Sequence, residues 1–427
     1  MQANLPGGTG DRDVLDESLM EVILSGENLR QAHRAVKRNK GAAGVDGITV
    51  DEIAAHMHQH WGTVRDKLYA GSYKPGLIKG VAIPKSNGGT RLLGIPTVQD
   101  RIIQQAVHQQ LCAIFDPTFS EFSYGFRPGR SAHDAIRTAQ SYVQAGKDWV
   151  IDIDISAFFD HVNHDILMHR VSERVSDKRV LKLIGRYLRA EIVLDGKVHK
   201  RLEGTPQGGP LSPLLANIYL DPLDKELERR GLCFSRYADD LNIYVSSERS
   251  AGRVFESISA WIEQHLKLQV NSAKSGTGRP WQRKFLGFRI RRDGEISIAP
   301  GSLTAYKDNV RRLWDARHSL TSHELIVRWN RYVRGWWNYY GLAVHKLFAL
   351  SAWTRRHMRK CFWLRWHSKR GRYNKLKRLG VSPRQLRRVD FYAGAWRAAG
   401  HPAMHTALGN RLLRDYHLVT PCDLAVS

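Results

Sequence analysis

The chain has 427 residues, of which 42% are apolar, so it can fill at least one substantial core, and intrinsic disorder is excluded as its default state. Its formal net charge is +25, which favours a polyanionic partner; nucleic acid is the commonest one and an anionic membrane is the rival. No stretch approaches 18 uninterrupted apolar residues, and the acidic, polar start lacks the features of a signal peptide. We therefore expect a cytoplasmic protein with no membrane partner.

The first third of the chain is predicted to form helices and one β-hairpin. Residues 10–70 carry apolar residues at helical spacing. Residues 77–96 contain two short strand-like runs around a turn whose glycines permit positive φ values, which predicts a β-hairpin with Lys85 and Arg91 near its tip. A helix is expected over residues 99–115.

The middle of the chain mixes strands and helices. Residues 148–156 alternate apolar and acidic residues with the period of a strand, so Asp152 and Asp154 face the same side. A helical segment at 165–190 is followed by a short strand pair around residues 195–196. This part of the chain is therefore predicted to contribute strands to at least one sheet.

Two turns dominate the next stretch. A loop at residues 204–210 opens a helix through Leu223, and residues 234–245 read as two strands joined by a tight acidic turn at Asp239 and Asp240. The rest is predicted as a helix around 249–267, a hairpin at 285–298 and a mostly helical remainder. The expected fold class is α+β, followed by an α-helical part.

Positive charge is concentrated in that last part. Residues 301–427 contain 25 Lys and Arg against 6 Asp and Glu, together with 8 of the 12 tryptophans. Flat rings interleaved with cations suit stacking on bases beside phosphate contacts, whereas a membrane-surface protein would gather them on one amphipathic helix. This distribution favours nucleic acid as the partner.

Three carboxylates carry the candidate chemistry. Asp154 ends one predicted strand, and Asp239 and Asp240 occupy the turn between two others. If these strands lie side by side in one antiparallel sheet, the carboxylates converge into a hard-oxygen site suited to two Mg²⁺ ions, with Mn²⁺ able to replace them. Two such metals can activate a hydroxyl nucleophile and stabilise a leaving phosphate. The alternative is that Asp-Asp at a hairpin tip is ordinary turn composition.

Three motifs carry a resemblance to a known family. Residues 237–240 (YADD) resemble the Y-x-D-D box of reverse transcriptases, and residues 205–213 (TPQGGPLSP) resemble the Q-G-x-x-x-S-P box of these enzymes. Residues 154–160 (DISAFFD) are similar to the family's first catalytic motif. The resemblance implies an RNA-directed DNA polymerase that extends primer DNA on template RNA with deoxynucleoside triphosphates. It also implies a right-hand polymerase fold, with fingers and a palm built on an antiparallel catalytic sheet.

The resemblance also implies roles for single residues. It alone selects Asp154 over Asp152, which shares its face. Phe159 would be the aromatic gate that excludes a 2′-hydroxyl, although Phe158 and Phe159 could also be core aromatics. For Lys85 and Arg91, the alternative is that they are ordinary solvated side chains in a loop. The implied residues are Asp154, Asp239 and Asp240 for catalysis, Asp154, Ile155, Asp239 and Asp240 for metal, and Lys85, Arg91, Phe159, Gln207 and Lys274 for the nucleotide.

Other blocks narrow the family. Residues 32–47 resemble the extra N-terminal block of group II intron enzymes, and residues 329–340 are similar to their maturase region, which serves as the thumb and grips intron RNA. Group II intron RNA is therefore an implied partner, with a role in splicing and retrohoming. The implied domains are 1–300 for fingers and palm, 301–367 for a helical thumb/maturase domain, and 368–427 for a basic C-terminal nucleic-acid-binding region.

Several points stay open from the sequence. Residues 123–131 resemble a further block of bacterial reverse transcriptases, in which Arg127 and Arg130 are either template-backbone contacts or structural arginines. Nothing matches the C-terminal endonuclease of many relatives, which favours the endonuclease-lacking subclass. We expect a monomer or homodimer associated with the nucleoid. The alternatives are a domesticated or defence-associated reverse transcriptase, or an RNA-binding splicing maturase with a vestigial polymerase.

Overall fold

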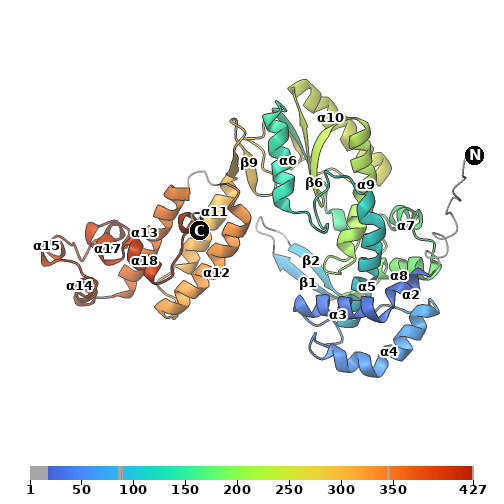
Figure 1. Cartoon of the computed structure of the whole chain (residues 1–427), viewed down its shortest axis with the longest axis horizontal. Coiled ribbons are helices and arrows are strands. Elements are labelled where there is room, and N and C mark those ends of the chain that lie inside the picture. Colours follow the sequence, from blue (N-terminus) through green and yellow to red (C-terminus); the bar gives the residue numbers. More distant parts are fainter. Residues whose placement is uncertain (1–17, 85–87, 89, 344–346, 426–427) are drawn as a thin grey trace, which may run out of the picture. The chain divides into compact units, whose positions relative to one another are not determined.

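The computed structural model describes residues 18–84, 88, 90–343 and 347–425. The chain forms two compact units that divide between Arg279 and Pro280 (Figure 1). Both units mix helices with antiparallel strand pairs, which confirms the α+β prediction. Among the described helices, none has the length and apolar character needed to cross a bilayer.

A four-stranded sheet, here called the central sheet, organises the first unit. Its strand order is β6-β7-β3-β8, and β3 pairs antiparallel with both of its neighbours. Ile151 and Ile153 are fully buried, as expected when alternate residues of a strand face opposite sides of a sheet. The strands are β3 (Trp149–Asp154), β6 (Cys233–Tyr237), β7 (Asp240–Val245) and β8 (Gly276–Gly278), and they confirm the strands predicted at 148–156 and 234–245. Helices α6 (Ala132–Gln144) and α10 (Glu248–Trp261) pack against this sheet.

A second sheet in the same unit has the order β2-β1-β4-β5. β1 (Ile78–Pro84) and β2 (Thr90–Ile95) form the hairpin predicted at 77–96, and β4 (Ile192–Leu194) and β5 (Lys197–His199) form the predicted short pair. β1 and β4 pair in parallel, a join that the sequence did not predict. Three-residue strands carry no periodic signal, and their partners are set by tertiary packing.

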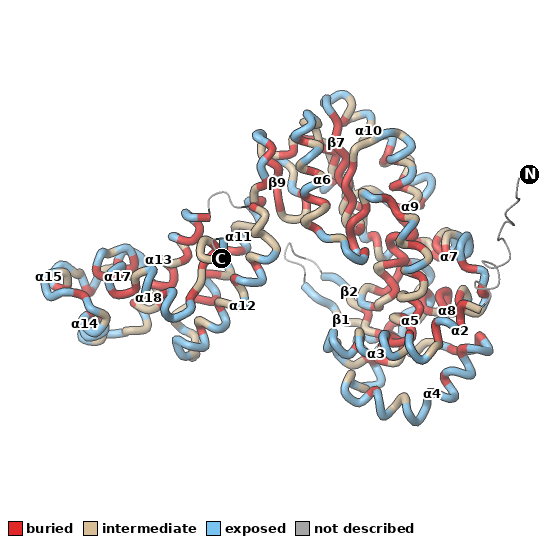
Figure 2. Tube along the Cα trace, viewed as in Figure 1, coloured by how far each residue is buried: buried red, intermediate tan, exposed pale blue. Residues whose placement is uncertain are grey.

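Helices bury the apolar core of the first unit. α5 (Val98–Phe115) confirms the helix predicted at 99–115, and the Thr97 side chain caps it by accepting a hydrogen bond from the Asp100 N–H. Figure 2 shows that much of α5 and α9 (Ser212–Arg229) is buried. The remaining helices are α2 (Leu19–Ile23), α3 (Gly26–Arg38), α4 (Ile53–Tyr69), α7 (His164–Ser172), α8 (Lys178–Leu188) and a π-helical turn at Ile262–Leu266 that continues α10.

The helical predictions differ from the structure in detail. In the N-terminal segment, residues 39–52 separate α3 from α4. The segment predicted at 165–190 is two helices, because the buried Asp177 side chain accepts a hydrogen bond from the Arg179 N–H and caps a new helix there. α9 continues beyond the predicted end at Leu223, with Pro222 inside it.

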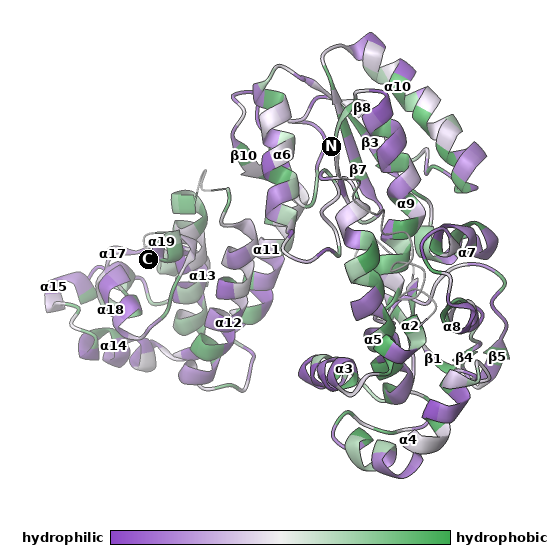
Figure 3. Ribbon diagram, turned by 45° about the vertical axis from the view of Figure 1, so that its right-hand side comes forward, coloured by the Kyte–Doolittle hydropathy of each residue, from purple (hydrophilic) through white to green (hydrophobic). Residues whose placement is uncertain are grey.

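The second unit begins with a β-hairpin and continues as helices. β9 (Phe288–Ile290) and β10 (Ile296–Ile298) confirm the hairpin predicted at 285–298. α11 (Pro300–Leu313), α12 (Ser322–Tyr340) and α13 (Leu347–Arg365) bury Trp329 and Trp363 between them and their neighbours. The shorter helices are α14 (Lys369–Arg378), which is mostly hydrophilic (Figure 3), α15 (Pro383–Leu386), α16 (Ala395–Ala399), α17 (Pro402–Ala407), α18 (Asn410–Asp415) and α19 (Pro421–Ala425).

The division between the units lies before this hairpin, whereas the sequence placed a domain boundary at residue 300. The Tyr339 hydroxyl donates to the Leu286 carbonyl at 2.8 Å. The rings of Tyr339 and Tyr340 lie 5.6 Å and 5.2 Å from the ring of Phe288. Because α12 makes these contacts, the hairpin belongs to the second unit.

Candidate active site

Strand pairing brings two of the predicted carboxylates together. In the register of β3 and β7, Asp154 lies directly opposite Asp240. Opposed residues of an antiparallel pair share one face of the sheet, with Cβ atoms about 4.5–5.5 Å apart. Asp239 precedes Asp240 in the turn, which follows Ala238 in the left-handed region at φ 58°. The acidic turn and the end of β3 therefore form one site.

The register also separates Asp154 from Asp152. Both residues face the same side of β3, as predicted, but Asp152 lies opposite Asn242. With its amide turned to donate, Asn242 lies 3.2 Å from the Asp152 carboxylate. Asp152 thus faces an amide donor and Asp154 faces a second carboxylate. The geometry favours Asp154 as the metal ligand for a reason that the sequence did not contain.

Burial and neighbouring charges shift the pKa of Asp239. Burial raises the pKa of its carboxyl above the ordinary value, and the negative charge of Asp154 raises it further. The cationic side chains of Arg91 and Arg236 act in the opposite direction. Asp154 and Asp239 are therefore close enough to repel each other, and a cation placed between them would relieve that repulsion.

Lys274 and Ser275 hold the end of β3. The Lys274 ammonium lies 3.5 Å from the Asp154 carboxylate. The Ser275 hydroxyl accepts a hydrogen bond from the Asp154 N–H at 2.9 Å and donates to the Asp154 carbonyl at 3.2 Å. Lys274 was predicted to belong to the site. Ser275 was missed, and its only signal in the sequence was its place directly after Lys274.

The glutamine loop lies against the β1–β2 hairpin. Arg91 donates from Nε to the Gln207 side-chain oxygen, and the Gln207 carbonyl accepts from the Gly94 N–H at 2.8 Å. A Cβ at Gly208 would lie 2.5 Å from the Gly94 carbonyl oxygen, so this approach requires glycine. Arg91, Gln207 and Asp239 thus belong to one neighbourhood. Lys85 lies outside the described residues.

The two phenylalanines after β3 have different environments. Phe158 is 2% exposed and belongs to the core, whereas Phe159 is only partly buried, with its ring 5.1 Å from that of Phe158. The Phe159 carbonyl accepts from the Thr205 N–H at 2.7 Å. Phe159 therefore sits beside the loop that carries Gln207, as a nucleotide gate would require.

Ile155 lies beyond the end of β3. It forms an isolated bridge with Val270, in which the hydrogen bonds run from Ser156 N–H to Gln269 carbonyl and from Asn271 N–H to Asp154 carbonyl. This pairing does not use the main-chain carbonyl of Ile155. A carbonyl oxygen is a hard ligand of the kind that Mg²⁺ accepts.

The donor chemistry fits a divalent hard cation. Within the described ranges, no three His, Cys, Asp or Glu side chains already converge as a complete metal cage. Mg²⁺ does not need one, because it commonly takes one or two carboxylates and completes its shell with waters and substrate phosphates. Asp154 and Asp239, whose charges repel each other, provide such a pair.

Arg127 and Arg130 differ in their surroundings. Arg127 is buried and donates to the Asp116 carboxylate at 2.7 Å and to the Ser123 carbonyl at 2.9 Å, which favours a structural role. Arg130 lies over the Tyr124 ring at 5.7 Å and donates to the Glu121 carbonyl.

The second unit carries cations over aromatic rings. Lys307 and Arg311 lie 5.7 Å and 5.5 Å from the centre of the Trp353 ring, beside a groove of about 510 Å³ that also involves Arg291. Arg356 lies 4.3 Å from the Trp396 ring. Side chains of this kind can contact phosphates and stack on unpaired bases.

Comparisons with known proteins agree with these features. Reverse transcriptase (RNA-dependent DNA polymerase) matches residues 83–290, and the group II intron maturase-specific domain matches residues 303–380. Protein YkfC of Escherichia coli (strain K12) is 34% identical over 299 residues, which cover 61% of this chain and 78% of that protein. The group II intron-encoded protein LtrA of Lactococcus lactis subsp. cremoris is 28% identical over 423 residues, which cover 76% and 70%.

A solved structure is more distantly similar. A chain of a partial Cas6-RT-Cas1–Cas2 complex is 24% identical, with a TM-score of 0.38, over 57% of this chain and 42% of that one, a likeness too low to carry an argument. The two family matches cover the first unit from Ile83 onward, the β9 strand, and the second unit from Leu303 through α14. The chain therefore belongs to the group II intron reverse transcriptases and maturases.

Proposed function

We propose that this RNA-directed DNA polymerase works by two-metal nucleotidyl transfer at Asp154 and Asp239, with Asp240 beside them. The observation that carries the proposal is the direct opposition of Asp154 and Asp240, which places Asp239, the preceding residue of the turn, at the same end of the sheet. Bound Mg²⁺, or Mn²⁺ in its place, would activate the primer 3′-hydroxyl and neutralise the leaving pyrophosphate. The carbonyl of Ile155, outside the strand ladder, is a further candidate ligand.

The surrounding side chains then have separate tasks toward the deoxynucleotide. Arg91, close to Gln207, supplies positive charge for the triphosphate, and Lys85 is proposed for the same task from its sequence alone. Gln207 lies against the nucleotide, and Phe159 excludes a 2′-hydroxyl from the sugar position. Lys274 balances the charge of Asp154 at 3.5 Å while Ser275 fixes the main chain beneath it.

Primer extension on an RNA template tests the metal proposal. Asp239→Asn should lose at least about a hundredfold in rate, since a catalytic metal contributes several kcal/mol to the transition state. Asp152→Asn is the matched control, because this carboxylate lies on the same face of the same strand but opposite Asn242. Its rate should stay within about twofold of the unmodified chain. Equal, measurable rates for Asp239→Asn and the unmodified chain would defeat the proposed metal role, and no extension by either protein would support the vestigial-polymerase alternative.

We also propose that the second unit binds group II intron RNA and so assists splicing and retrohoming. Support comes from the 25 Lys and Arg against 6 Asp and Glu in residues 301–427 and from the cations over Trp353. The name of the relative LtrA, a group II intron-encoded protein, agrees with this assignment. Splicing of a group II intron transcript at low Mg²⁺, with and without the protein, tests it. Splicing that is no faster with the protein would contradict it.

A further inference from the structure

Arg236 is a fully buried cation next to the catalytic turn. It lies on β6, one residue before Tyr237, and its exposure is 1%. Removing a guanidinium from water costs several kcal/mol unless its charge is balanced and its donors are all used. The contacts of the Arg236 guanidinium suggest why a buried cation lies beside this turn.

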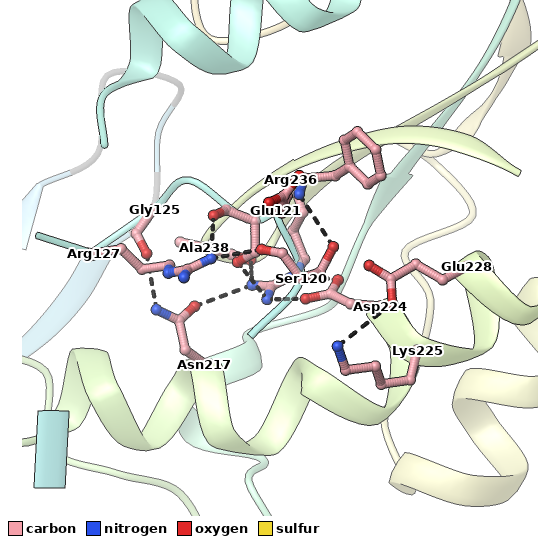
Figure 4. Close-up of polar contacts among 12 residues, drawn as sticks. Ser120, Glu121, Gly125, Arg127, Asn217, Asp224, Lys225, Glu228, Arg236 and Ala238 are labelled. Carbon is pink, nitrogen blue, oxygen red and sulfur yellow. Dashed lines mark hydrogen bonds and ion pairs between the residues drawn. The ribbon is translucent and has the colours of Figure 1, made fainter. Parts of the chain in front are cut away.

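Each of the five N–H groups of the guanidinium has an acceptor (Figure 4). Asp224 on α9, which is 0% exposed, accepts from Nε at 2.7 Å and also from Nη2. Asn217 accepts from Nη1 at 3.1 Å, and the Ser123 hydroxyl accepts from Nη2 at 2.8 Å. The fifth acceptor, at 2.8 Å from Nη1, is the main-chain carbonyl of Ala238.

The Ala238 carbonyl belongs to the peptide bond that joins Ala238 to Asp239. A peptide unit is planar, so fixing its oxygen also fixes the orientation of the Asp239 nitrogen and Cα. The same residue is held from its other side, because a Cβ at Gly125 would lie 2.2 Å from the Ala238 nitrogen. Asn217 joins both contacts, since its amide donates to the Gly125 carbonyl at 2.8 Å.

The left-handed backbone of Ala238 makes this support necessary. A non-glycine residue at φ 58° is in a sparsely populated conformation, which persists only where the surroundings determine it. Without the guanidinium, the turn could relax and Asp239 could leave its position beside Asp154. Buried ion pairs add little net stability compared with apolar side chains, and their best-attested use is to specify one arrangement.

We propose that Arg236, held by Asp224 and Asn217, is a positioning residue that fixes the Ala238–Asp239 peptide and thereby presents the Asp239 carboxylate to the metal. This inference rests on the proposed metal-binding role of Asp239. Arg236 itself touches neither metal nor substrate. Its loss weakens metal binding because only the fraction of molecules with the correct turn is competent.

The double variant Arg236→Met/Asp224→Leu tests the proposal in the full chain. Apolar replacement of both partners of a buried ion pair is often neutral for stability. Thermal unfolding should therefore be close to that of the unmodified chain, whereas the Mg²⁺ midpoint for primer extension should rise roughly tenfold if a tenth of the molecules keep the competent turn. Direct Mn²⁺ binding, followed by electron paramagnetic resonance without nucleotide, should weaken by the same factor, and template–primer affinity should not change.

Arg127→Met is the matched control. Arg127 is also a buried arginine in the same unit, and it pairs with the aspartate Asp116. Its hydrogen bonds go to Asp116 and to the main-chain carbonyls of Ser120 and Ser123, and none goes to the turn at Ala238 and Asp239. This variant should lower the unfolding temperature and leave the Mn²⁺ affinity unchanged. A double variant with normal Mn²⁺ affinity and a normal Mg²⁺ midpoint would overturn the proposal and leave Arg236 as a purely structural residue.

Ser123→Ala carries the test if the double variant does not fold. It removes one of the five acceptors without adding bulk, at a cost of about 1 kcal/mol. The Mn²⁺ affinity should then fall about twofold to fivefold with unchanged template binding, and an unchanged affinity would overturn the proposal. Failure of the metal role of Asp239 is recognised separately, because Asp239→Asn would then bind Mn²⁺ and polymerise like the unmodified chain.

Discussion

The two units of the chain differ in where most of their charge lies. In the first unit, buried charges are matched by hydrogen bonds: Arg236 pairs with Asp224, and Asp100, at 2% exposure, accepts from Tyr73 at 2.8 Å and Tyr187 at 3.1 Å. In the second unit, cations such as Lys307 lie over tryptophan rings in a region with a large surplus of positive charge. If the proposed functions hold, the chemistry of the first unit depends on the orientation of its side chains, and RNA binding by the second unit depends on accumulated positive charge. Substitutions in the two units should therefore affect different measured quantities.

The largest effect on activity is expected at Gly125, because the main chain of the turn at Ala238 leaves no room for a side chain there. In Gly125→Ala the new Cβ would lie 2.2 Å from the Ala238 nitrogen and 2.9 Å from the Tyr237 carbonyl carbon, so the turn must move. Misplacement of a reacting group by about 1 Å costs roughly a hundredfold, and we expect at least that loss in kcat for primer extension.

Gly252→Ala is the control for this substitution. A Cβ at Gly252, in the middle of α10, meets no atom within 4 Å. Its activity should be unchanged and its unfolding temperature equal or slightly higher, because alanine favours helix over glycine. Normal kcat in Gly125→Ala would break the claim that the first unit depends on orientation.

The next effect concerns the nucleotide rather than the template. Arg91→Ala should raise the KM for deoxynucleotides about 10- to 100-fold, because a hydrogen bond to a charged group contributes about 1.5–3 kcal/mol. Template–primer affinity, measured by fluorescence anisotropy, should stay the same. Arg137→Ala, which removes an exposed arginine of α6 paired with Asp134, should leave the KM unchanged. A KM for Arg91→Ala equal to that of the unmodified chain would remove Arg91 from the site.

In the second unit we expect a smaller and less specific effect. Lys307→Ala should weaken RNA binding several-fold for all sequences and reduce the slope of log affinity against log salt by about 1, as loss of one phosphate contact does. The kcat at saturating template should not change. Arg317→Ala is the control, because Arg317 is paired with Asp315 at 2.6 Å. An unchanged salt slope in Lys307→Ala would place the RNA surface elsewhere.

The smallest effect is on stability and depends on pH. Because burial and the charge of Asp154 raise the pKa of Asp239 in the folded chain, its ionisation costs folding free energy at neutral pH. Asp239→Asn removes that cost, so its free energy of unfolding should exceed that of the unmodified chain at pH 7. The gain should fall as pH decreases through the folded pKa and vanish below the ordinary value of 3.8, where both states are protonated. Urea denaturation across this range checks the sign, and a less stable Asp239→Asn at pH 7 would contradict it.

Sequence patterns predicted the local parts of this molecule well. The hairpins, the strand at 148–156 and the helix at 99–115 follow from glycine turns and periodicity. The motifs pointed to Asp154 and Asp240, which lie opposite each other in the central sheet, and to Asp239 in the turn beside them. The parallel join of β1 and β4 was not predictable, since its residues lie far apart in the chain and the strand is short. Arg236 was also missed, because a single arginine in a strand is expected to be exposed to solvent. Only the folded structure shows that Asp224 and Asn217 accept its hydrogen bonds.

The order of strands in the central sheet has a consequence for biosynthesis. β3 ends at Asp154, but its edge partner β8 begins at Gly276, so the sheet cannot close until the ribosome has made that later segment. At roughly 5–20 residues per second, β3 waits on the order of ten seconds for β8, and its other edge stays open until β7 (Asp240–Val245) has been made. During this interval its apolar residues are accessible to chaperones or to other nascent chains, and slower translation of residues 155–275 would prolong that exposure.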